Sequence, residues 1–142
     1  MQVYVPVCIR QVAGETSAAM NALLSMKTKV VTPRVDATRD WYRDLLGLKV
    51  LEEWDEPNDY GCILGLHSTP GQALLEIHLQ TKDSDFSGFG LQFRVEDVDA
   101  FAVPEDERFQ FRGPITRPWG SRYLFFSDPN GISVVVFSGN SL

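Results

Sequence analysis

The stretch Trp119–Phe137, WGSRYLFFSDPNGISVVVF, carries the most information about the fold. Its two runs, Tyr123–Ser127 and Ile132–Phe137, are rich in β-branched and aromatic residues, which favour strands. Between them, Asp128–Gly131 (DPNG) places proline where a type I turn needs a fixed φ and glycine where the chain needs a positive φ. The stretch therefore predicts two strands joined by a tight turn.

The whole chain has 142 residues, enough for one domain with a buried core. Its hydrophobic content of 44% and charged content of 23% are ordinary for a soluble globular protein. The net charge of −6 argues against a nucleic-acid partner, because binding phosphates requires a basic surface. No run is long or apolar enough for a membrane helix, and no signal segment opens the chain. With two cysteines and no disulfide framework, we expect a reduced, cytoplasmic protein without a membrane partner.

Residues 27–81 read as a first structural unit. A strand is predicted at Lys27–Thr32, followed by a helix that Asp36 caps and that ends at Leu46, with Gly47 as its C-cap. Further strands are expected over residues 48–54, 60–66 and 73–80. The unit is therefore βαβββ.

A second unit over residues 90–138 repeats this order after a polar linker at residues 82–89. A strand at Leu91–Val95 precedes Asp97, which is predicted to cap a second helix that Pro104 shortens. A strand at Phe109–Arg112 and the two strands described above complete the unit.

The spacing of equivalent signals supports an internal repeat. The predicted caps Asp36 and Asp97 are 61 positions apart, and the turn prolines Pro70 and Pro129 are 59 apart. The sequence thus predicts an α+β fold of two tandem βαβββ units.

Residues 1–26 precede the repeat and are interpreted as an accessory extension. Val3–Ile9 resembles a strand and Glu15–Ser25 could form a short helix. Residues 139–142 form a short tail. Neither end carries a functional signal.

Three motifs occur in the order of a known family. They are Arg34–Asp36 with Trp41–Gly47, then Phe93–Asp99, and finally Trp119-Gly120 ahead of the last two strands. In this order they resemble the glyoxalase/bleomycin-resistance/dioxygenase superfamily, also called vicinal oxygen chelate proteins, over roughly residues 27–138. The resemblance implies that the two units form a cupped mixed sheet around a cavity, often by exchange of units between two chains.

The resemblance also implies where a catalytic divalent metal would be held. In the family's enzymes the ligands come from the first and fourth strands of each unit, which corresponds here to Lys29, Glu76, about Gly90, and Val135. Only Glu76 can bind a cation, whereas a catalytic site needs about three protein ligands. We therefore expect neither a metal nor another cofactor.

A scaffold without its metal resembles the drug-binding branch of this superfamily, whose members bind ligands in aromatic grooves, often at a dimer interface. Four aromatic residues on strands or strand-entry loops are candidates for stacking on a flat ligand: Trp54, Tyr60, Trp119 and Tyr123. Packing in the core is the alternative for each of them, and it is the expectation for Trp41 and Tyr42 on the helix.

Polar candidates lie on the predicted inner strands. Glu76 and His78 share one face of a strand and could bind a metal or act as acid and base, or they could be a polar face neutralised by Lys29 or Arg94. Gln92 and Arg94 share a face in the same way, while His67 lies beside a turn.

Two functional hypotheses follow. The first is a homodimeric, metal-free protein that binds and sequesters an aromatic or cationic small molecule, for example an antibiotic. The second is a lyase, isomerase or transferase that uses Glu76 and His78.

Overall fold

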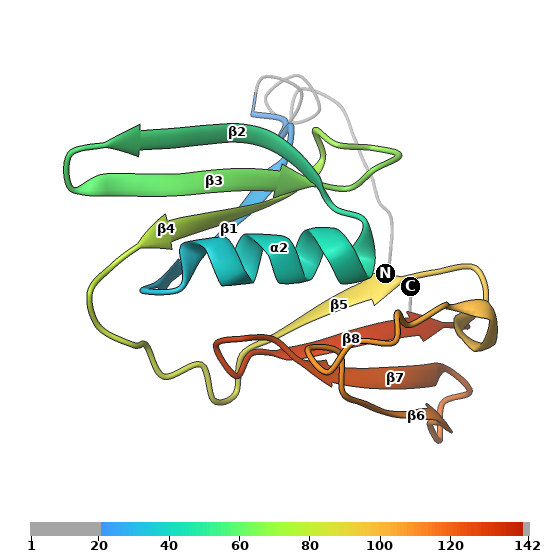
Figure 1. Ribbon diagram of the computed structural model, residues 1–142. Helices are drawn as coiled ribbons and strands as arrows, with labels where there is room; N and C mark the ends of the chain where they lie inside the picture. Colours follow the sequence, from blue (N-terminus) through green and yellow to red (C-terminus); the bar gives the residue numbers. More distant parts are fainter. Residues whose placement is uncertain (1–20, 141–142) are drawn as a thin grey trace.

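One α-helix lies between two four-stranded mixed sheets in the computed structural model, which describes residues 21–140 (Figure 1). The first unit contains β1 (Met26–Thr32), α2 (Val35–Leu46), β2 (Lys49–Glu56), β3 (Asp59–Gly65) and β4 (Ala73–Leu79). The second contains β5 (Gly90–Arg94), the 3-10 turn η1 (Val98–Ala100), β6 (Phe111–Thr116), β7 (Arg122–Ser127) and β8 (Ser133–Ser138). The predicted α+β class and the tandem repeat are confirmed.

The two sheets have the same internal order. The first is β1-β4-β3-β2 and the second is β5-β8-β7-β6, so that in each sheet the first and last strands of the unit pair in parallel and the others are antiparallel. Most of the extension predicted at residues 1–26 lies outside the described residues, and residues 21–25 contain no helix or strand. Within residues 21–140, no helix has the length and apolar character needed to cross a membrane.

Helix α2 buries one face, as its sequence pattern predicts. Its buried residues recur at intervals of three or four: Val35, Thr38, Trp41, Tyr42 and Leu45. Gly47 ends the helix in the left-handed conformation with φ 69°, as expected for a C-cap. The predicted N-cap is wrong. The helix begins at Val35, because the Arg34 carbonyl accepts the first helical hydrogen bond, from the Thr38 N–H at 3.0 Å, and Asp36 lies in the first turn.

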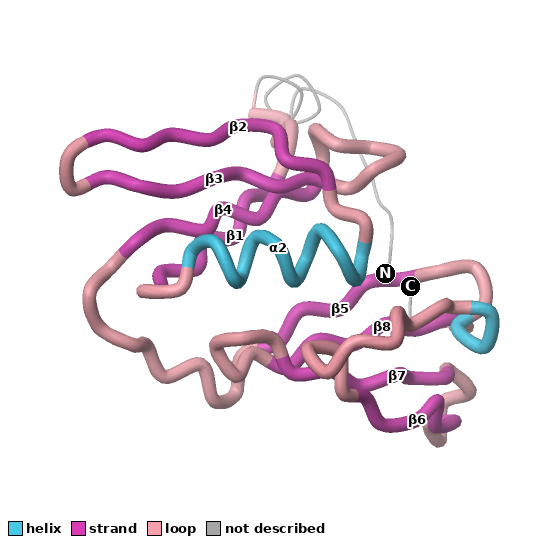
Figure 2. The backbone as a smooth tube through the Cα atoms, in the orientation of Figure 1, coloured by secondary structure: helices cyan, strands magenta, loops and turns pink. Residues whose placement is uncertain are grey.

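Both sheets pack on this single helix (Figure 2). The Trp41 ring lies edge-on to Phe109 and Phe126 of the second unit, with centroids 6.0 and 6.3 Å away. One continuous core joins the helix to the inner side chains of both sheets, which include Val30, Leu64 and Ile77 in the first and Leu124, Phe126, Val134 and Val136 in the second. The other face of each sheet therefore points away from α2, and we call these the outward faces.

The second predicted helix is wrong in extent. Asp97 does cap the segment, accepting a hydrogen bond from the Asp99 N–H at 3.0 Å, but only the 3-10 turn Val98–Ala100 follows. Phe101 is already extended, and Pro104 disfavours a helical conformation at the residue before it. Helix α2 consequently covers the inner faces of both sheets.

The predicted turn at Asp128–Gly131 is confirmed and is docked on α2. Gly131 has a φ of 82°, and its N–H donates to the Asp128 carbonyl at 3.0 Å. The Asp128 carboxylate accepts hydrogen bonds from the backbone N–H groups of Asn130 and Ile132, and from the Tyr42 hydroxyl at 2.7 Å. The turn that organises β7 and β8 is thereby fixed to the helix of the other unit.

Candidate binding site on the outward faces

The outward face of the second sheet is built from two rows of cross-strand neighbours. Residues that alternate with the inner core positions make up these rows, since successive side chains of a strand point to opposite faces. The rows are Arg112–Phe125–Val135–Gln92 and Ile115–Tyr123–Phe137–Arg94. We call this surface the aromatic face. The predicted residues Tyr123, Gln92 and Arg94 therefore share one face.

An aromatic cluster occupies the centre of the aromatic face. The Tyr123 ring lies 6.0 Å from Trp119, 5.8 Å from Phe125 and 5.7 Å from Phe137, centroid to centroid. Phe137 is buried beneath the cluster, whereas 53% of Trp119 is exposed. Gly120, with φ 100°, lets the chain turn directly after Trp119. The cluster therefore presents an indole at its rim.

Two arginines stack on this cluster. The Arg112 guanidinium carbon is 4.2 Å from the centroid of Phe125, and the Arg117 guanidinium carbon is 5.1 Å from that of Trp119 and 5.8 Å from that of Tyr123. The contacts are cation–π in type, with the guanidinium held over the ring. The aromatic face is therefore basic as well as aromatic.

The outward face of the first sheet carries a polar group that we call the Asp59 group: Trp54, Asp59, Gly61 and His78. The Asp59 carboxylate lies 2.7 Å from the His78 Nε2 and accepts a hydrogen bond from the Trp54 Nε1 at 2.8 Å. These hydrogen bonds, that of His78 first, lower the pKa of Asp59. A side chain at Gly61 would come within 2.6 Å of the Trp54 ring, so glycine lets the indole lie against β3.

Glu76 also points outward from this sheet, but it is engaged separately. Its carboxylate forms an ion pair with Lys27 at 2.8 Å, while its direct cross-strand neighbour is Lys29. His78 is bonded to Asp59 and not to Glu76. The pair singled out in the sequence is thus placed on one face, and each member has its own partner.

Tyr60 lies apart from both groups. Its cross-strand partner is Asp55, so it points to the side of the sheet that α2 covers, and its hydroxyl donates to Asp36 at the start of that helix. The structure brings Trp119, Tyr123, Gln92 and Arg94 together on one sheet, and Trp54, Glu76 and His78 together on the other.

The strand register revises the positions that the resemblance assigned to metal ligands. Lys29 pairs with Glu76 in the first sheet, and the equivalent pair in the second sheet is Gln92 with Val135. The first-strand position is therefore Gln92 instead of Gly90. Of the four ligand positions, only Glu76 and Gln92 carry oxygen donors, because Lys29 and Val135 cannot bind a cation; two donors do not fit a centre that needs about three protein ligands. Over residues 21–140 there is also no group of three His, Cys, Asp or Glu side chains close enough for a metal.

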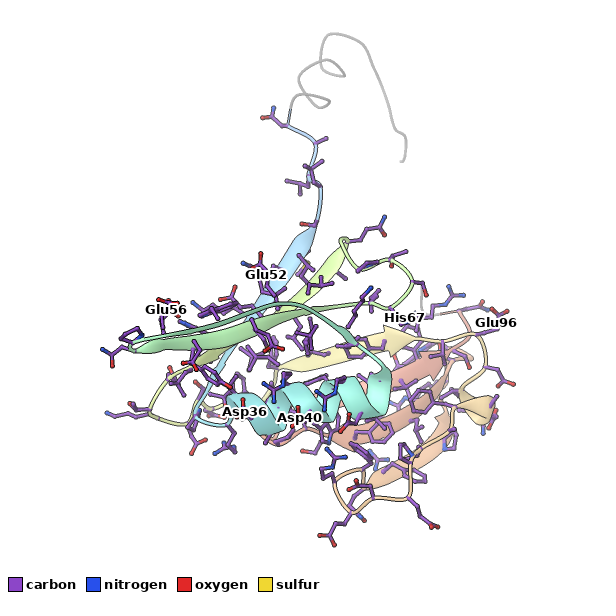
Figure 3. All side chains as sticks on the ribbon, turned by 45° about the horizontal axis from the view of Figure 1, so that its top comes forward. Asp36, Asp40, Glu52, Glu56, His67 and Glu96 are labelled. Atoms are coloured by element: carbon purple, nitrogen blue, oxygen red, sulfur yellow. The ribbon has the colours of Figure 1, made fainter. Side chains whose placement is uncertain are left out.

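His67 does not join either outward group. It is exposed in the loop between β3 and β4, at the opposite end of the first sheet from Glu56 (Figure 3).

A cavity of about 320 Å³ lies between the two units, where β1 and β4 approach β5. Its lining is mainly aliphatic and aromatic and includes Leu48, Leu64, Leu75, Leu91 and Phe93, and Gln92 and Arg94 also border it. This is a cavity between the units of one chain, and it meets the aromatic face at Gln92 and Arg94.

The residues of these surfaces that were not singled out in the sequence include Asp59, Arg112, Arg117 and Phe125. Alternation along β3 places Asp59 on the same face as Gly61, which is the cross-strand neighbour of His78. This alternation is a signal that the sequence offers for Asp59. No comparable signal exists for Arg112, because the register of β6 shifts between Arg112 and Ile115.

The chain belongs to the Glyoxalase/Bleomycin resistance protein/Dioxygenase superfamily, whose family model matches residues 25–136. This confirms the resemblance seen in the sequence motifs. A search of curated proteins returned no match.

Several solved structures are similar in fold. TnmS3, an antibiotic binding protein from Streptomyces sp. CB03234, is 21% identical with a TM-score of 0.64, covering 82% of this chain and 95% of its own. A lactoylglutathione lyase from Agrobacterium tumefaciens is 23% identical with a TM-score of 0.59, covering 80% and 92%. An integron cassette protein from the metagenome of the Halifax Harbour sewage outfall is 17% identical with a TM-score of 0.65, covering 81% and 97%. At these identities the similarity concerns the fold alone.

Proposed function

We propose that this chain is a binding protein for a small planar aromatic molecule, which it holds without a bound metal. The observation that carries the proposal is the aromatic cluster on the second sheet, with the half-exposed Trp119 beside Tyr123. A flat ligand that stacks on an indole gains about 1 kcal/mol beyond the area that it buries. An antibiotic of this chemistry is one candidate, because the fold relative TnmS3 is an antibiotic binding protein.

We further propose that two copies of the chain build each site. Both sheets pack their inner faces on α2, so the aromatic face and the Asp59 group lie on opposite sides of one chain. A homodimer would bring the aromatic face of one protomer against the first sheet of its partner, and the ligand would lie between them. Trp54, Glu76 and His78 would then line the same site as Trp119, Tyr123, Gln92 and Arg94.

Trp119→Ala is expected to weaken binding of the neutral planar probe 2-naphthamide about fivefold, because one stacking surface is lost. Isothermal titration calorimetry measures the affinity, and a thermal melt checks that the variant stays folded. The matched control is Phe111→Ala. Phe111 is 54% exposed, close to the 53% of Trp119, but its ring contacts Phe126 on the inner face.

In this experiment Phe111→Ala should leave the affinity unchanged. An unfolded Trp119→Ala variant, or one that binds 2-naphthamide as the parent does, contradicts the site. Mass spectrometry of the recovered probe adds a further check, because a chemically altered probe contradicts a purely binding function.

Light scattering at micromolar concentration should give twice the chain mass of 16.0 kDa. Mixing two defective variants then tests the shared site. In a mixed dimer, one site combines the intact aromatic face of the Trp54→Ala chain with the intact first sheet of the Trp119→Ala chain. This site should bind 2-naphthamide with the parent affinity, while neither variant alone should do so. A monomer, or a mixture without recovered sites, contradicts the two-copy site.

A second candidate function is acid–base catalysis on the first sheet. The observation that favours it is the 2.7 Å contact between Asp59 and His78, because a carboxylate can orient an imidazole for proton transfer. The fold relative from Agrobacterium tumefaciens, a lactoylglutathione lyase, is consistent with such chemistry. In this case His78 would transfer the proton and Glu76 would contact the substrate.

A further inference from the structure

The charge on the aromatic face indicates which planar molecules would bind there. The described part of the chain contains eight arginines, and five of them form ion pairs with carboxylates: Arg34, Arg39, Arg43, Arg108 and Arg122. Within residues 21–140, no carboxylate lies within ion-pair distance of the other three, Arg94, Arg112 and Arg117.

All three unpaired arginines belong to the aromatic face. Arg94 and Arg112 are in its two cross-strand rows, and Arg117 stacks on Trp119 and Tyr123. A protein with a net charge of −6 has ample carboxylates to neutralise them, yet within residues 21–140 none reaches Arg112 and Arg117 at the β6 side of this face, or Arg94 on the opposite edge strand β5. Arg112 and Arg117 stack on neighbouring rings of the aromatic cluster, and guanidinium groups are the donors that proteins commonly use to bind anions.

The stacking geometry leaves the arginines able to donate. A guanidinium that lies over a ring uses its face for the aromatic contact and keeps its N–H groups, which lie in its plane, for an acceptor. In addition, the Nε of Arg117 is buried without a hydrogen-bond partner. A buried donor without an acceptor is unfavourable, so an acceptor supplied by a ligand would be strongly preferred there.

Two carboxylates on the outward face of the opposite sheet are already engaged, whereas Glu52 and Glu56 share that face and form no ion pair within residues 21–140. Glu76 is paired with Lys27, and Asp59 is held by His78 and Trp54. If the first sheet of a partner covers the aromatic face, these two carboxylates are committed within their own protomer.

We infer that the ligand of this site is a planar aromatic anion, such as an aromatic carboxylate or phenolate, whose ring stacks on the aromatic cluster and whose anionic group accepts hydrogen bonds from Arg112 and Arg117. This inference rests on the proposed function and sharpens it. It replaces the cationic ligand expected from the acidic composition, because the local charge of the site is opposite in sign to the net charge of the chain.

The test compares three probes that share the naphthalene ring system and differ in charge: the anion 2-naphthoate, the neutral 2-naphthamide, and the cation 2-naphthylmethylammonium. Calorimetry on the full chain should show 2-naphthoate binding about tenfold more tightly than 2-naphthamide, since hydrogen bonds to charged groups are the strong ones. The ammonium probe should bind most weakly.

Charge-removing variants locate the effect. Arg112→Met and Arg117→Met keep an unbranched apolar stem over the rings, and each should weaken 2-naphthoate binding several-fold more than 2-naphthamide binding, so that the preference for the anion falls. Arg122→Met is the matched control. It removes the same charge from the same sheet, but Arg122 is bound to Asp99 at 2.7 Å, and the preference should persist.

The outcomes separate this inference from the proposed function. Equal binding of the three probes, with 2-naphthamide still sensitive to Trp119→Ala, overturns the anionic ligand and leaves the binding function in place. Failure of all three probes overturns both. If Arg112→Met or Arg117→Met dissociates the dimer in light scattering and weakens all probes equally, the arginines bind the partner subunit and the inference is wrong.

Discussion

Replacing Trp41 by alanine is expected to lower the free energy of unfolding by about 3–5 kcal/mol, the range for truncating a large buried aromatic residue. Trp41 is 1% exposed and lies where α2 meets the second sheet. Its ring contacts Tyr42, Phe109 and Phe126, and its Nε1 donates to the Arg108 carbonyl at 3.0 Å. The substitution leaves both a cavity and an unpaired carbonyl at the junction of the two units.

Urea denaturation monitored by circular dichroism measures this loss. Trp119→Ala serves as the comparison, because its ring is half-exposed and its removal should cost no more than about 1 kcal/mol. If the two substitutions destabilise the protein equally, the assignment of Trp41 to the core and of Trp119 to a surface site is wrong.

Asp128→Ala should have the second-largest effect, a loss of about 3 kcal/mol of unfolding free energy, because a buried carboxylate with three hydrogen bonds is removed. The lost bonds are those to the N–H groups of Asn130 and Ile132 and to the Tyr42 hydroxyl. Tyr42 is fully buried, and burial and then Asp128 raise the pKa of its phenol, which therefore remains a donor. Without Asp128 that donor has no acceptor.

A double-mutant cycle with Tyr42→Phe isolates this contact. Phenylalanine removes the orphaned hydroxyl, so the double variant should be more stable than the sum of the two single losses predicts. Strict additivity would show that the contact between the turn and α2 contributes nothing to stability.

The regular part of this fold could be predicted from the sequence because its signals are local. The DPNG turn, the helical spacing of Trp41 and Tyr42, and Gly47 as a C-cap each act through neighbouring residues. The second helix could not be predicted correctly. Asp97 gives a valid capping signal, but the extended backbone that follows depends on tertiary packing, with α2 already covering the second sheet.

Some residues of the candidate site could likewise be grouped from local sequence, and others could not. Trp119 and Tyr123 could be grouped from one short stretch, and the structure places their rings 6.0 Å apart. The separation of Tyr60 from the other candidates depends on which residue begins β3, since a shift of one residue reverses the face. The stacking of Arg112 on Phe125 and of Arg117 on Tyr123 joins separate segments of the chain, so it could not be predicted from the sequence.

The sharing of α2 by both sheets has a consequence for the independence of the two halves. In an array of repeats that each own a complete core, one repeat can unfold while its neighbour persists. Here the second sheet buries its inner face on a helix that the first half contributes, so a fragment of residues 90–138 would expose Leu124, Phe126, Val134 and Val136 to water. The sixty-residue periodicity is therefore seen in the sequence and the backbone but not in the hydrophobic core, which the two halves share. We therefore expect the two halves of the described chain to unfold in one cooperative transition.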